Sequence, residues 1–267
     1  MLRSVLLKSL WDQRRSLMWW SLGLIAVALY TVLFYPSVRD MGSTLDQLIE
    51  SMPPALRATF AGEFTDFTSP MGYLNTQLFF VMMPLLFFFY SIGFGSGAIA
   101  GEEEKGTLEL LLSNPLNRWR AVLEKFGAMV VSLAALGVAL WAGLAVGAVV
   151  VDMRVDLGRL AEATVSALLL SLTFGSLALG LGCARGHRGT AMGVTAAVAV
   201  AAYLLNSLAP QVESLKPYRP LSPFYYYLRA DPVANGLSLG DMSVLLGLSL
   251  AFLVIGLLLF ERRDLRV

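Results

Sequence analysis

The sequence has 267 residues, of which 57% are hydrophobic and 15% are charged, and its mean hydropathy is +0.67. A soluble domain of this length is far less apolar, so the composition predicts a membrane protein with room for about six spans of roughly 20 residues. The net charge of +1, without a long basic run, argues against a nucleic-acid partner, and the single cysteine, Cys183, excludes an intrachain disulfide framework.

The first 16 residues predict an amphipathic helix that lies in the membrane interface, because basic and apolar side chains alternate along them. The first span is predicted at residues 17–35. This run is too long for the apolar core of a signal peptide, and we expect it to end before Pro36. Residues 36–72 are of mixed polarity and predict short helices that lie flat on the outer surface.

The second span is predicted at residues 73–100. It contains Pro84, so we expect a kink or a tilt in this helix. Glycines spaced four residues apart, at 93 and 97 in this span and at 143 and 147 in the next, permit close contact between helices.

A charged segment, residues 101–120, follows the second span. It begins with three successive glutamates, Glu102, Glu103 and Glu104. A charged side chain at the centre of a membrane helix costs about 2.5–3.5 kcal/mol, so the span must end at about residue 100. The glutamates are predicted to be solvated or to form salt bridges with a partner. A divalent-cation site or a pair of catalytic carboxylates is disfavoured, because successive residues of a helix splay apart.

The second half of the charged segment predicts a short helix with one apolar face. Leu108, Leu111 and Leu112 recur at helical spacing, and Glu109 lies off their face. Proline disfavours helical geometry in the residue before it, so Asn114–Pro115 is predicted to end this helix and to begin the next one.

Four further spans are predicted at residues 122–151, 161–184, 190–209 and 242–260. A short hairpin at 152–159 and a basic turn at 185–189 connect the first three of these spans. Residues 210–240 contain five prolines and an aromatic cluster at 224–227, which predicts short interfacial or partly re-entrant helices on the outer face.

The distribution of Lys and Arg predicts the orientation. Thirteen of the 20 lie on the side of the N-terminus, the charged segment, the basic turn and the C-terminus. Since cytoplasmic loops carry the excess of Lys and Arg, both termini and the charged segment are predicted to be cytoplasmic. No charged residue lies in the interior of a predicted span, whereas pumps driven by protons or ions commonly need an intramembrane acid or base.

Catalytic and nucleotide motifs are not supported. Gly101 and Gly106 have the spacing of the glycines in a P-loop, but Thr107 stands where that motif needs lysine. His187 is the only histidine, so a Ser-His-Asp triad or a multi-histidine metal site cannot form within one chain. We therefore expect no catalytic residue, metal or cofactor in this chain.

The charged segment resembles the corresponding run in permease subunits of type-2 ATP-binding-cassette (ABC) transporters, usually exporters. The matching positions are Gly101, Glu102, Lys105, Gly106, Thr107, Leu108, Glu109, Leu111, Leu112, Pro115 and Arg118. One departure is Glu124, where the family pattern has a glycine before the lysine. The first 16 residues correspond to the family's interfacial elbow helix, and residues 221–237 are similar to its outer segment.

The resemblance implies an all-α permease of six transmembrane helices in the plasma membrane. It would dimerise with itself or a related chain and bind two ABC ATPase subunits, which hold ATP and Mg. The charged segment would be the coupling helix. Its leucines would pack into a groove of the ATPase, Pro115 would fix the elbow, and the glutamates with Lys105 would pair with the partner's charges. For Arg118, the alternative to a contact with the ATPase is anchoring to lipid phosphates.

Two alternatives to a transport subunit belong to other functional classes. An intramembrane enzyme needs polar catalytic groups that face each other inside the spans, and the sequence lacks them. A membrane scaffold, moved by an ATPase, would act on an external partner through residues 36–72 and 210–240 without a transported solute. The uncharged spans suggest an apolar or amphipathic cargo for a transporter.

Overall fold

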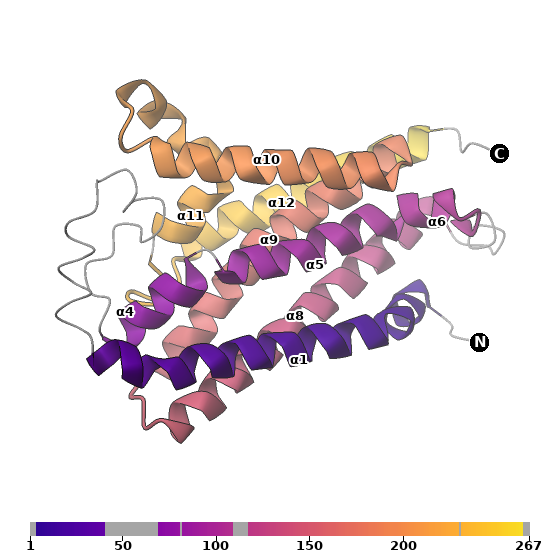
Figure 1. The fold of residues 1–267 in the computed structure, drawn as a ribbon. Coiled ribbons are helices and arrows are strands. Elements are labelled where there is room, and N and C mark those ends of the chain that lie inside the picture. The colour runs from indigo at the N-terminus through magenta and orange to yellow at the C-terminus, as the bar shows by residue number, and fades with distance from the viewer. Residues whose placement is uncertain (1–3, 41–68, 81, 109–116, 230, 264–267) are drawn as a thin grey trace.

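In a computed structural model, residues 4–40, 69–80, 82–108, 117–229 and 231–263 are described, and all their regular elements are helices (Figure 1). Six helical stretches among them are long and apolar enough to cross a membrane. The prediction of an all-α membrane protein with six spans is confirmed. The spans are Val5–Arg39, Pro70–Ala98, Arg118–Val150, Leu157–Arg185, Arg188–Leu208 and Leu239–Arg262.

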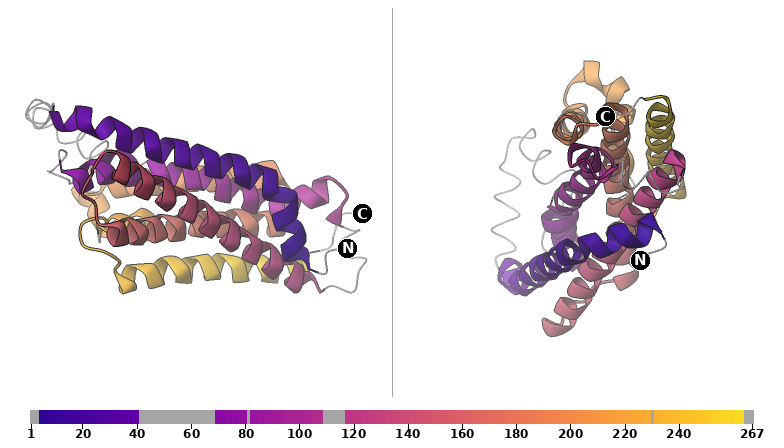
Figure 2. Two further views of the ribbon diagram at one scale, coloured as in Figure 1. Left: turned by 90° about the horizontal axis from the view of Figure 1, so that it is seen from below. Right: turned by 90° about the vertical axis from the view of Figure 1, so that its right-hand side faces the viewer.

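The first helix, α1 (Val5–Asp40), includes both the predicted interfacial helix and the first span. No break separates the two, because residues 14–20 contain no glycine or proline that would end a helix. The helix bends toward its N-terminal end (Figure 2, left). The expected end before Pro36 is wrong: Pro36 lies in the last turns of α1, where its missing N–H costs one hydrogen bond to the carbonyl of Val32.

The second span is divided in three. A short helix, α4 (Pro70–Leu74), leads into a π-helix, η1 (Asn75–Phe79), and then into α5 (Met82–Ala98). The irregularity in this span is the π-helical turn. Pro84, where a kink or a tilt was expected, lies in the first turn of α5, where a missing N–H costs no hydrogen bond of that helix.

The next three helices are α8 (Arg118–Val150), α9 (Leu157–Arg185) and α10 (Arg188–Leu208). Helix α8 begins after Asn117, whose backbone is extended, so the predicted start at Pro115 is wrong. Asn114 and Pro115 themselves lie outside the described residues. A 3₁₀ helix, η2 (Glu213–Leu221), and α11 (Pro223–Arg229) form in the proline-rich region, and α12 (Leu239–Arg262) completes the bundle.

Helix α9 lies at the centre of the bundle, where it contacts α5, α8, α10 and α12, while α1 packs along α8 (Figures 1 and 2). Glycines make the closest approaches possible. A Cβ on Gly95 of α5 would lie 2.3 Å from the carbonyl oxygen of Gly175 in α9. Gly143 and Gly147 of α8 face α1, as their spacing predicted, but Gly93 has open space beside it.

The bundle has two chemically different ends. The terminal end carries the start of α1, the end of α12 and the short helix α6 (Ala100–Glu104); the distal end carries α4, η2 and α11 (Figure 1). Hydroxyl groups inside the central helix α9 bond within that helix, and that of Thr173 also lies within hydrogen-bond distance of the Leu245 carbonyl of α12, at 3.1 Å. Those of Thr164, Ser171, Thr173 and Ser176 each donate to the carbonyl four residues earlier.

Candidate functional site at the terminal end

The glutamates of the charged segment form α6, which continues α5 by one turn after a change of direction at Ile99. The backbone N–H groups of Glu102 and Glu103 donate to the Ile99 carbonyl. The turn ends at Gly106, which has a positive φ of 67°, and the Thr107 hydroxyl donates to the Glu102 carbonyl at 3.1 Å. Because α6 is so short and directly joined to α5, a displacement of the glutamates moves the end of α5.

Glu102 joins α6 to α8. Its carboxylate forms a hydrogen-bonded ion pair with Lys125, whose side chain is only 9% exposed. Removing one member of a buried ion pair leaves the other charge without a partner, which is strongly destabilising. The second carboxylate oxygen of Glu102 is buried without a hydrogen-bond partner, so this pair already bears a desolvation cost.

Glu103 joins α6 to the ends of α9 and α12. Its carboxylate pairs with the Arg263 guanidinium, which also donates to the carbonyl oxygen of Cys183 at 2.9 Å. Arg118, at the start of α8, donates to the carbonyls of Arg263 at 2.8 Å and Phe260 at 3.3 Å. A cation is favourable at the C-terminus of a helix, so Arg118 stabilises the end of α12.

Glu104 joins α6 to α10. Its carboxylate accepts a hydrogen bond from the backbone N–H of Arg188, the first residue of α10, at 2.8 Å, and lies 4.0 Å from His187 Nδ1. The Glu104 and His187 side chains are 43% and 56% exposed. A carboxylate at a helix N-terminus is favourable, but solvent weakens this contact relative to the two buried pairs.

Gly186 lets the chain turn between α9 and α10 beside these pairs. Its φ is +68°, a left-handed conformation that favours glycine. A Cβ at this position would lie 2.6 Å from both Arg263 Nη2 and Glu103 Oε2. The basic turn predicted at 185–189 is therefore part of the glutamate cluster, which we define as Glu102, Glu103 and Glu104 with their partners.

The structure shows partners within the chain that the sequence did not predict for this cluster. We expected the glutamates to pair with charges of another protein, but Glu102 and Glu103 pair within the chain. Their partners Lys125 and Arg263 lie 23 and 160 residues away, a separation from which sequence spacing predicts no contact. Leu108, expected to enter a partner's groove, is 2% exposed and packs in the chain's own core, because the turn at Gly106 directs the chain back toward the bundle.

The other predicted site residues divide in two groups. Lys105, Gly106 and Thr107 are exposed at the tip of the turn. Glu109, Leu111, Leu112 and Pro115 lie outside the described residues. Lys125, Arg188 and Arg263 are among the 13 basic residues predicted on the cytoplasmic side. Their contacts with the glutamates were not predicted.

Glu124, the departure from the family pattern, has a structural role. Its carboxylate accepts a hydrogen bond from the backbone N–H of Leu6 at 3.0 Å and pairs with Arg120 at 2.9 Å. The side chain thus joins the first turn of α1 to α8, a contact that glycine could not make.

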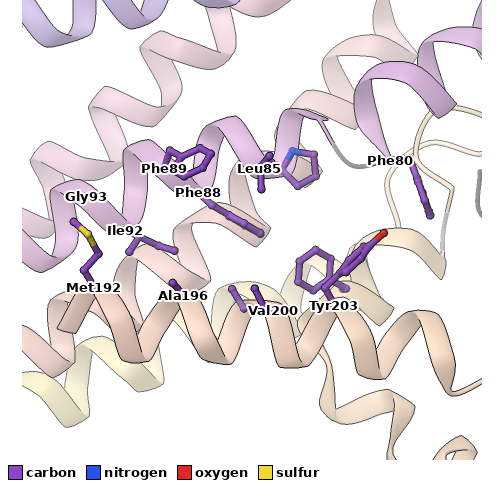
Figure 3. Close-up of a pocket in the computed structure, with 13 residues that line it drawn as sticks. Phe80, Leu85, Phe88, Phe89, Ile92, Gly93, Met192, Ala196, Val200 and Tyr203 are labelled. Atoms are coloured by element: carbon purple, nitrogen blue, oxygen red, sulfur yellow. The ribbon is translucent and has the colours of Figure 1, made fainter. Parts of the chain in front are cut away.

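An apolar groove of about 430 Å³ lies between α5 and α10 (Figure 3). Phe88 and Ile92 of α5 face Ala196 and Val200 of α10. Phe224 of α11 also lines the groove. This volume falls in the range of about 300–1,000 Å³ typical of small-molecule pockets. Met192 and Gly93 line its other end, one helical turn from the Arg188 backbone held by Glu104.

At the distal end, hydrogen bonds without a cation hold the π-helix, and an ion pair of Arg229 with Asp241 at 2.9 Å joins α11 to the start of α12. The Tyr227 hydroxyl donates to the Phe79 carbonyl of the π-helix at 2.6 Å, and burial raises the pKa of this phenol. The Asn75 side chain donates to the Asp231 carboxylate at 2.7 Å. Burial raises the pKa of Asp231, although that hydrogen bond and backbone N–H groups oppose the shift.

No group of three His, Cys, Asp or Glu side chains among the described residues is placed to hold a metal ion. The Gly101–Thr107 stretch forms a helical turn at the end of a membrane helix, and Thr107 carries no cation for a phosphate. This turn therefore lacks the lysine that a phosphate-binding loop needs.

The sequence matches a family model described as "ABC-2 family transporter protein" over residues 3–265. No curated protein matches the sequence.

Proposed function

The chain belongs to the ABC-2 family of transporter proteins, whose members are membrane subunits of ABC transporters, and we propose that it couples ATP hydrolysis by separate ATPase subunits to the export of a substrate. In this proposal two permease chains, identical or related, form the assembly with two ATPase subunits. The ATPase subunits bind ATP and Mg, and this chain supplies the path through the membrane.

The glutamate cluster is the observation that carries the proposal. A force on the charged segment acts first on α6, and the contacts of Glu102, Glu103 and Glu104 pass it to α8, to the ends of α9 and α12, and to the start of α10. The exposed tip at residues 104–107 leaves the segment accessible to a partner. Such an arrangement suits a subunit that receives motion at one end of the bundle.

The orientation rests on charge. The terminal end carries the excess of Lys and Arg, which supports a cytoplasmic position for both termini and for the charged segment, in the plasma membrane. The glutamate cluster gives a second reason for the basic residues at this end, because Lys125 and Arg263 neutralise its carboxylates.

The groove between α5 and α10 supports transport of a cargo over mechanical action on an external partner. Its lining is almost wholly apolar, so it suits an apolar or amphipathic molecule. A scaffold that only transmits motion needs no such groove. Substrate uptake into vesicles, compared with capture of an external partner, separates the two functions.

Two measurements test the proposal: which side of the membrane each end of the bundle faces, and which subunits the assembly contains. In a Cys183→Ala background, the exposed residues Lys105 and Lys216 are replaced by cysteine one at a time. A membrane-impermeant thiol reagent applied to intact cells should label the Lys216→Cys variant and not the Lys105→Cys variant. The assembly purified from native membranes should contain a nucleotide-hydrolysing subunit. Labelling of Lys105→Cys from outside, or an intact assembly without such a subunit, would contradict the proposal.

A further inference from the structure

The three glutamates of α6 differ in how easily their contacts separate. The Glu102 and Glu103 side chains are 19% and 13% exposed, and their partners Lys125 and Arg263 are 9% and 18% exposed. Glu104, at 43%, is the most exposed of the three. Water replaces a lost partner readily at an exposed site, whereas separating a buried pair leaves charges without solvent. Glu104 therefore forms the contact that is broken at the lowest cost.

The contact of Glu104 lies at one end of the apolar groove. Its acceptor oxygen binds the first N–H of α10, and α10 forms one wall of the groove while α5 forms the other. The Arg188 side chain lies along the glycines of the opposite wall, since Cβ atoms on Gly97 and Gly101 would be 3.5 Å and 3.7 Å from it. The Arg188 side chain therefore packs against both α5 and α6.

We propose that Glu104 is a positioning residue that holds the first turn of α10 against α5 and α6, and that its contact separates first when the charged segment is displaced. The groove then opens at the terminal end, while α8 and α12 stay joined to α6 through the buried pairs. The source of the displacement rests on the proposed function, but the holding role of Glu104 is a property of this chain alone.

Cross-linking across the groove tests this role. Gly93 and Met192 line the same pocket from α5 and α10 near its terminal end (Figure 3). A Cβ on Gly93 meets no atom within 4 Å, and Met192 is 37% exposed, so both positions accept cysteine. The double variant Gly93→Cys/Met192→Cys, made in the Cys183→Ala background and reconstituted in lipid nanodiscs without any ATPase, is treated with a short bifunctional thiol reagent.

Adding Glu104→Ala should slow cross-linking by about 2- to 10-fold, which is the change in an equilibrium constant expected from losing one hydrogen bond of this kind. Glu104→Gln keeps an acceptor for the Arg188 N–H and should restore a rate within about twofold of the parent. Glu261→Ala, which removes an exposed glutamate at the same end, should leave the rate unchanged.

An unchanged rate in Glu104→Ala overturns the proposal, and so does an equal slowing by Glu261→Ala. A loss in Glu104→Gln as large as in Glu104→Ala contradicts the assigned hydrogen bond. These outcomes do not depend on ATP, on a partner or on transport. An assembly that lacks an ATPase would therefore refute the proposed function and leave this result standing.

Discussion

The two ends of the second span are attached to the bundle by different chemistry. At the terminal end, α6 is held by ion pairs of Glu102 and Glu103 with residues of other elements. At the distal end, the π-helix is held by the Tyr227 hydroxyl and by the amide of Asn75. The Glu104 contact beside these pairs is exposed and can be exchanged with the charges of a partner, whereas a buried hydroxyl–carbonyl bond offers nothing to a charged partner. The proposed function needs such a difference, with a terminal end that responds to a partner and a distal end that stays fixed.

Breaking the buried Glu102–Lys125 pair at the terminal end should cause the largest loss of stability. Lys125→Met leaves Glu102 buried without its cation and should lower the free energy of unfolding by about 3–5 kcal/mol, measured by thermal or denaturant unfolding in detergent. The double variant Glu102→Met/Lys125→Met removes both charges and should recover most of the loss. If the single variant is as stable as the parent, the pair does not anchor α6.

At the distal end, Tyr227→Phe tests whether one hydrogen bond fixes the π-helix. The variant keeps the ring but leaves the buried Phe79 carbonyl without its donor, which should cost about 1–3 kcal/mol of unfolding free energy. Tyr218→Phe is the matched control, because Tyr218 is 55% exposed and should tolerate the change. Equal stability of the two variants would show that the hydroxyl of Tyr227 is not needed.

A substitution in the turn at Gly186, beside the glutamate cluster, should have an intermediate effect on the free energy of unfolding. Gly186→Ala adds a Cβ at positive φ against the Glu103–Arg263 pair, and we expect a loss of about 1–2 kcal/mol. Gly189→Ala, in the first turn of α10 with open space around it, should be neutral or slightly stabilising. Comparable melting temperatures for the two alanine variants would contradict the close packing at Gly186.

The smallest effect is the dependence of distal-end stability on pH. The pKa of Asp231 is higher in the folded state than its ordinary value of 3.8. The folded state therefore binds this proton more tightly, and the corresponding stabilisation, present at low pH, is lost as pH rises through the raised pKa. Asp231 has a φ of +42°, which asparagine tolerates, so Asp231→Asn should remove this part of the pH dependence of the melting temperature. Parallel curves for the two proteins would contradict the shift.

The sequence was sufficient for the features that depend on local composition. Uncharged apolar runs predicted six spans, and the glycine spacing at 143 and 147 predicted a close helix contact, because both signals repeat within one helix. Proline was less informative: Pro36 was expected to end a helix and does not, while the irregularity near Pro84 appeared as a π-helix before it.

The contacts of the candidate site could not be predicted from the sequence. The three glutamates marked the end of a span correctly, since their cost in hydrocarbon is a local property. Their pairing with Lys125, Arg263 and the Arg188 N–H depends on how five helices assemble, and no spacing rule reports that. Leu108 shows the same limit, because an apolar face at helical spacing is equally suited to a partner and to the chain's own core.

ATP hydrolysis coupled to transport is the most direct test of the central claim, that the charged segment receives motion from an ATPase. The purified assembly in vesicles should hydrolyse ATP and move substrate, and Leu111→Asp should leave the chain inserted while uptake per ATP hydrolysed falls. Glu261→Ala, an exposed change at the same end but outside the segment, should keep the parental ratio. Unchanged uptake per ATP in Leu111→Asp would contradict the docking role of the segment.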